Sequence, residues 1–235
     1  MMTYQLANYR GVAGHFKHSS ALAGLLRHAG CVGPHTGEAW SEAMLLGIGG
    51  GLGAGYILWE FKAHHSAVLT LGFHHRWNYT KEWYEQTLER VGAVGTWMET
   101  GGARRAAKAL DAALRNGHPA LCWVDEFHLP YMHVSEAFEG CFGWVVTVFG
   151  LDQHHVRLDD VWGPALKVDR ACFEHARARI GSYKHRQLTV VSGQGCIDLR
   201  ASVRAGINAH IAYLGGKSTS FGLGAVRKWS RTLTD

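Results

Sequence analysis

The chain has 235 residues, of which 47% are hydrophobic and 18% are charged. This composition is typical of a folded globular protein and excludes a largely disordered one. The net charge of +5, with 16 histidines in addition, favours acidic partners such as a phosphorylated carrier or an anionic metabolite. Because the basic residues are scattered and form no block or basic–aromatic repeat, we expect no nucleic-acid partner.

The cysteine pattern indicates a reduced protein. The five cysteines are odd in number, irregularly spaced and without a CxxC pair: Cys31, Cys122, Cys141, Cys172 and Cys196. The sequence shows neither a basic–apolar leader nor an apolar run near 18 residues. We therefore expect a soluble, cytoplasmic protein that does not bind a membrane.

The first part of the chain reads as helices followed by strands. After a loop at 11–18, Ser19 or Ser20 is expected to cap a helix that runs to about Ala29, with Gly30 at its C-terminal end. A second helix is predicted at 40–46, and the glycine-rich stretch 47–55 connects it to two strands, "YILWEF" and "AVLTLGF". Because only glycine takes a positive φ without strain, we expect at least one such residue in this stretch.

The second part contains the predicted core. The expected elements are helices at 81–91, 103–116 and 170–180, strands at 119–124, 144–152, 156–160 and 187–191, and two helices within 196–235. The strands 144–152 and 156–160 should form a hairpin that turns at Asp152 and Gln153. Helices that precede an antiparallel sheet predict an α+β fold. We expect two domains, a main domain at 1–195 and a helical extension at 196–235.

Several local motifs fail the tests for nucleotide or metal binding. "GGKSTS" at 215–220 lacks the earlier glycine of a phosphate loop and follows a helix, and "GGGLGA" at 49–54 precedes a strand where a dinucleotide fingerprint must follow one. The doublets His64-His65, His74-His75 and His154-His155 are poor chelates, because neighbours on a strand face opposite ways. We therefore expect neither a metal nor a cofactor.

Five stretches together suggest a family. These are "GHFKHSSALAGLLRHAG", "WSEAMLLGIGGGLGAGYILWEF", "ALCWVDEFHLPY", "VVTVFGLD" and "VRLDDVWG". In their order they resemble the N-terminal domain family of butirosin biosynthesis protein H. The resemblance implies a papain-like fold, related to that of bacteriocin-processing cysteine peptidases, with helices packed on an antiparallel sheet. It also implies acyl transfer from an acyl carrier protein through a cysteine thioester.

The cysteine of that family is replaced here. In the family, a His-Cys pair precedes small hydroxyl residues and Ala-Leu. Alignment on Ala21 and Leu22 puts Lys17 at the cysteine and Phe16 at its histidine, whereas a shift that aligns His15 puts Phe16 at the cysteine. Neither alignment supplies a thiol, so the thioester mechanism does not carry over.

The strand histidine of the family is missing as well, while its aspartate is kept. Cys141, Gly143 or Trp144 lies near the place of the histidine, and Asp159-Asp160 matches the acidic element. A lysine at a helix N-terminus should have a lowered pKa, because the dipole disfavours the ammonium, and a neutral amine attacks carbonyls.

These comparisons define the candidate site. The candidate catalytic residues are Lys17, His18, Ser20, Asp160, His15 and Cys141, and the candidate substrate-binding residues are Glu42, Trp144 and Tyr131. Each has a simpler interpretation. Lys17 and the histidines would be exposed on a loop, and Ser19 and Ser20 would be helix caps. Asp160 would lie in water at a hairpin end, Glu42 would cap the second helix, and Cys141 would be a packed apolar residue.

Two functions stay open at this point. In the first, the protein is an enzyme of specialised-metabolite biosynthesis that acts on an acyl or carbonyl intermediate by condensation, cyclisation or acyl transfer. In the second, it is a catalytically silent relative that binds an acyl carrier protein or a partner subunit. Because the family's usual C-terminal helices are shortened here, we expect a homodimer or a complex with another chain.

Overall fold

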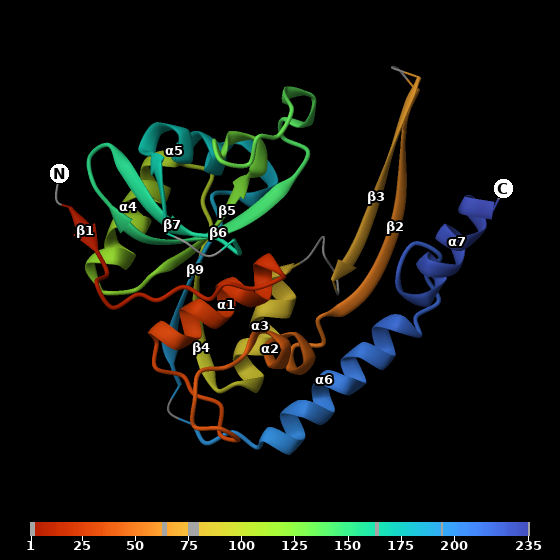
Figure 1. Cartoon of the computed structure of the whole chain (residues 1–235), viewed down its shortest axis with the longest axis horizontal. Helices are drawn as coiled ribbons and strands as arrows, with labels where there is room; N and C mark the ends of the chain where they lie inside the picture. The colour runs from red at the N-terminus through yellow and green to blue at the C-terminus, as the bar shows by residue number, and fades with distance from the viewer. Residues whose placement is uncertain (1–2, 63–64, 75–79, 163–164, 194, 235) are drawn as a thin grey trace. The chain divides into compact units, whose positions relative to one another are not determined.

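The computed structural model describes residues 3–62, 65–74, 80–162, 165–193 and 195–234. They form two compact units, shown in Figure 1. The first unit comprises Met1–Glu42 and Gly92–Gly195, and the second comprises Ala43–Val91 and Cys196–Asp235. The helices predicted within 196–235 therefore share a unit with 43–91. The predicted domain division at 195/196 stays a prediction.

The first unit is built on a seven-stranded sheet in the order β4-β9-β5-β6-β7-β8, with β1 also paired to β6. The strand bounds are β1 (Tyr4–Gln5), β4 (Ala93–Met98), β5 (Ala120–Asp125), β6 (Gly143–Leu151), β7 (His155–Asp159), β8 (Leu166–Asp169) and β9 (Gln187–Ser192). The pairings among these strands are antiparallel, and β6 and β7 form the predicted hairpin. All six residues of β5 are buried, which explains its nearly continuous apolar sequence.

Helices cover both faces of this sheet. The helices are α1 (Lys17–His28), α4 (Ala103–Arg115) and α5 (Arg170–Arg179), with short turns η2 (Glu126–His128), η3 (Glu136–Phe138) and η4 (Gly181–Tyr183). Leu110, Leu114 and Phe173 of α4 and α5 share one core cluster with apolar residues of β5 and β6. On the other face, α1 packs on β5, β6 and β9 (Figure 1). The predicted α+β fold is confirmed.

The helix α1 begins earlier than its sequence suggests. It starts at Lys17, with Phe16 in the N-cap position and no side-chain capping bond from that residue. The expectation that Ser19 or Ser20 caps this helix is therefore wrong, since both lie within its first turn. The C-terminal end follows the prediction: Gly30 has a φ of +72° and its N–H bonds to the carbonyl of Arg27.

The second unit combines a hairpin with helices. Its elements are α2 (Glu42–Ile48), whose first residue belongs to the first unit, β2 (Leu52–Phe61), β3 (Ser66–His74), α3 (Thr80–Arg90), α6 (Leu199–Leu214) and α7 (Gly222–Thr234). β2 and β3 pair antiparallel, and α6 and α7 pack on β2. Gly50 has the predicted positive φ, +70°. Within the described ranges, no helix combines the length and apolarity needed to cross a membrane.

Candidate functional site

The amine of Lys17 is held where α1 meets the start of β6. Lys17 is the first residue of α1 and is half-buried. Its Nζ donates a hydrogen bond to the carbonyl oxygen of Gly143 at 2.8 Å and lies 4.0 Å from the centroid of the Trp144 ring, which is a cation–π distance when the amine is charged. The interpretation of Lys17 as an exposed loop residue is therefore wrong.

A buried carboxylate binds the ring nitrogen of this indole. Trp144 Nε1 donates to both oxygens of Asp160, at 3.0 and 2.9 Å. Asp160 Oδ2 also accepts from the Tyr131 hydroxyl at 2.8 Å, and its Oδ1 accepts from the Val161 N–H at 2.6 Å. Asp160 is 5% exposed, so it does not lie in water at a hairpin end. Lys17, Trp144, Asp160 and Tyr131 thus form one continuous cluster.

Glu126 completes the electrostatics of this cluster. Burial lowers the pKa of Lys17 to about 8, against the opposing effect of the carboxylates of Glu126 and Asp160. Burial also raises the pKa of Glu126, partly offset by Lys17. The sequence patterns did not single out Glu126. Its only signal was its position directly after the buried strand, within the family-like stretch "ALCWVDEFHLPY".

Glu42 anchors the N-terminal end of α1. Its carboxylate accepts from the backbone N–H groups of His15 and Phe16, at 2.9 and 2.6 Å, and from the hydroxyls of Ser19 and Ser20, at 2.9 and 3.0 Å. Burial alone would raise the pKa of Glu42, but these hydrogen bonds outweigh burial and lower it. The carboxylate therefore serves α1 rather than capping the second helix, and Ser20 is engaged with it.

The remaining predicted residues lie in different environments. His15 is exposed, while His18 is buried with its ring 5.5 Å from that of Phe16. Cys141 is exposed, so it is not the packed apolar residue that its strand suggested. Its Sγ lies 3.9 Å from the carbonyl oxygen of Glu139. None of the contacts recorded among the described residues joins Cys141 to Lys17 or Asp160.

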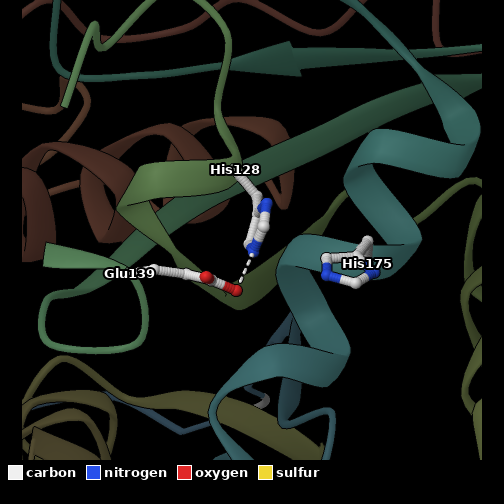
Figure 2. Close-up of side chains that lie close together, drawn as sticks. All are labelled: His128, Glu139 and His175. Atoms are coloured by element: carbon white, nitrogen blue, oxygen red, sulfur yellow. Dashed lines mark hydrogen bonds and ion pairs between the residues drawn. The ribbon is translucent and has the colours of Figure 1, made fainter. Parts of the chain in front are cut away.

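A second group of polar side chains lies elsewhere in the first unit. His128, Glu139 and His175 each offer one ligand atom, and these atoms lie within 4.8 Å of one another (Figure 2). The three residues are far apart in sequence, so the search for histidine doublets did not find them. Of those doublets, His154 and His155 lie beside Asp152, whereas His64 and His75 are outside the described residues.

The fold is papain-like. A putative C39-like peptidase from Bacillus anthracis matches with a TM-score of 0.52 and 15% sequence identity, over 82% of this chain and 98% of that one. The family described as butirosin biosynthesis protein H, N-terminal, matches residues 17–161, and the chain belongs to this family. No curated protein matches the sequence significantly.

Proposed function

We propose that this protein is a biosynthetic enzyme that uses the Lys17 amine on a carbonyl intermediate. The observation that carries the proposal is the half-buried amine at the first residue of α1, with a pKa lowered to about 8. About a tenth of the amine is then neutral at pH 7, and a neutral amine is the form that attacks carbonyl carbon. Membership of the butirosin protein H family supports a role in biosynthesis.

The amine chemistry favours a ketone or aldehyde over an acyl thioester as the covalent partner. Attack on a thioester would expel the thiol and leave a stable amide on Lys17, which would end turnover. Attack on a ketone or aldehyde forms a C–N bond and, after loss of water, an imine that water later cleaves. Acyl transfer stays possible only with Lys17 as a proton acceptor for another nucleophile.

Proton transfer in this proposal falls to Glu126. The indole of Trp144 is a donor only and cannot replace a histidine base. Glu126 has a raised pKa next to Lys17, so it is suited to take the proton that the amine loses on attack and to return it to the departing hydroxyl. Asp160 orients Trp144, and Trp144 in turn positions the amine.

Borohydride trapping tests the proposal. The intact protein is incubated with small aldehydes, α-keto acids and β-keto thioesters, reduced, and mapped by mass spectrometry. We expect an adduct on Lys17 that is lost in Lys17→Ala and Lys17→Arg. Lys108→Ala, which removes an exposed lysine of α4, serves as the matched control. Equal labelling of the wild type and Lys17→Ala across all probes would reject Lys17 as the nucleophile.

A second function is favoured by the same cluster. The amine already bonds to Gly143 and the Trp144 face, which is also how a structural lysine would fill a lost active site. In that case the protein binds an acyl carrier protein or a partner subunit, and its net charge of +5 suits an acidic carrier. Salt-dependent binding of a phosphopantetheinylated carrier that survives Lys17→Ala, with no trapped adduct, would support this function.

Light scattering tests the expected homodimer.

A further inference from the structure

We propose that His128, Glu139 and His175 bind a divalent transition metal such as Zn²⁺. Two imidazoles and one carboxylate form a donor set that zinc uses when three protein ligands leave a coordination position open. Three separate elements contribute: η2 carries His128, the turn after η3 carries Glu139, and α5 carries His175. Such a metal would tie these segments together.

The distances are close to those of a bound metal. His128 Nε2 lies 3.2 Å from Glu139 Oε1. The rings of His128 and His175 meet edge to face with centroids 4.3 Å apart. Bonds of about 2.0–2.1 Å in a tetrahedron place neighbouring ligand atoms roughly 3.4 Å apart. The three ligand atoms lie within 4.8 Å of one another. Rotation of the exposed His175 side chain by at most about 1.5 Å would therefore bring them to tetrahedral spacing.

A buried carboxylate orders two of the three ligand segments. Asp125 is 0% exposed. Its Oδ1 accepts from the backbone N–H of Phe127 at 3.3 Å, next to His128, and its Oδ2 accepts from that of Gly140 at 2.8 Å, next to Glu139. One side chain thus fixes the backbone on both sides of the site before any metal arrives, which lowers the cost of ordering the ligands.

Arg179 competes for the same carboxylate. Its Nε lies 2.7 Å from Glu139 Oε1, and it follows His175 by one helical turn on α5, so both side chains face Glu139. Figure 2 shows His128 and Glu139 joined, with the His175 ring beside them. In the metal-free protein Arg179 neutralises Glu139. A divalent cation would replace the guanidinium there, and removal of Arg179 should therefore strengthen metal binding.

Metal titration of the tag-free protein tests the proposal. Equilibrium dialysis with Zn²⁺ and the visible absorption of Co²⁺ should show one site per chain. His175→Ala and Glu139→Gln should each weaken binding by more than about tenfold. His154→Ala, which removes an exposed histidine from outside the cluster, is the matched control and should bind as the wild type does. Zn²⁺ should raise the thermal midpoint of the wild type but not of His175→Ala.

Two results would overturn the proposal. The first is an absence of metal binding, or binding that His175→Ala weakens no more than His154→Ala does. The latter would mean that scattered surface histidines bind the metal. The second comes from Arg179→Gln, which should bind the metal more tightly. Unchanged or weaker binding in that variant would show that Arg179 and the metal do not share Glu139, which would reject the proposed ligand set. His175 and Arg179 are at the surface, so both variants should fold.

Discussion

The indole nitrogen of Trp144 donates to both carboxylate oxygens of Asp160, at 3.0 and 2.9 Å. In a papain-like site an acidic or amide side chain orients a histidine base in this way, and the base faces a nucleophile at a helix N-terminus. Here Asp160 holds an indole instead, and the Lys17 amine lies over its face. Asp160 therefore positions an indole beside the amine of the first residue of α1.

Restoring a cysteine and a histidine should therefore restore a reactive thiol. In Lys17→Cys/Trp144→His, the thiol would lie at the helix N-terminus beside an imidazole held by Asp160, and both features lower a thiol pKa. Alkylation with iodoacetamide at pH 6.5 should be at least about tenfold faster at this position than in Lys17→Cys alone. The exposed native Cys141 is the internal reference. Equal rates in both variants would show that Asp160 cannot hold a histidine.

Removal of the Glu126 charge should lower the pKa of Lys17 further. Glu126 opposes the effect of burial on that amine, so Glu126→Gln leaves the ammonium less stabilised. Site-resolved amine labelling should reach half its maximum near pH 8 in the wild type and at a lower pH in Glu126→Gln. Glu136→Gln, an exposed change in η3, should leave the profile unchanged. A shift to higher pH in Glu126→Gln would contradict the assigned electrostatic effect of Glu126 on Lys17.

Glu42 should contribute stability at neutral pH that is lost in acid. Its folded-state pKa lies below the ordinary 4.5, so its contribution is fully present above that pH and fades as pH falls through the folded-state value. Glu42→Ala removes four hydrogen bonds at the start of α1 and should cost about 1–3 kcal/mol at pH 7. The difference from wild type in denaturant unfolding should shrink below pH 4. Exposed Glu38→Ala should change little at either pH.

Asp159 should have the opposite pH dependence. Burial raises its pKa from 3.8 to about 6, and the charge of nearby Asp160 adds to the rise, although the hydrogen bond from the Tyr9 hydroxyl lowers the pKa. The folded state then holds a proton that the unfolded state has released, so stability is lost between about pH 4 and pH 6 as pH rises, by at most about 3 kcal/mol. Asp159→Asn should flatten the fall in unfolding free energy across that window. Asp111→Asn on α4 should keep the wild-type slope.

The glycine run should matter for folding more than for selectivity. Gly50 has a φ of +70°, and a Cβ built there would lie 2.7 Å from the Cβ of Ala209. Gly50→Val combines backbone strain with overlap and should lower the yield of folded protein. Gly47→Ala is the matched control, because nothing lies within 4 Å of its Cβ position. Normal stability of Gly50→Val with altered substrate selectivity would contradict this expectation.

The sequence by itself determined the elements whose signal is local. The buried apolar runs predicted β5 and β6, helical spacing predicted α1 and α4, and Gly30 marked the end of α1, because each depends only on neighbours within one turn or one strand. The start of α1 was misplaced, because the carboxylate that accepts hydrogen bonds from the N–H groups at this helix end belongs to Glu42, in another element. A capping partner 26 residues away leaves no local pattern.

Only the tertiary structure decided how the polar side chains combine. Lys17 and Asp160 could be named from family-like stretches, but whether they were buried together depended on the register of β6 against α1 and β7. Glu126 and the cluster of His128, Glu139 and His175 carried no motif, because their spacing in sequence is arbitrary. Periodicity reports which face of an element is buried, whereas a polar cluster depends on which buried faces the chain path brings together.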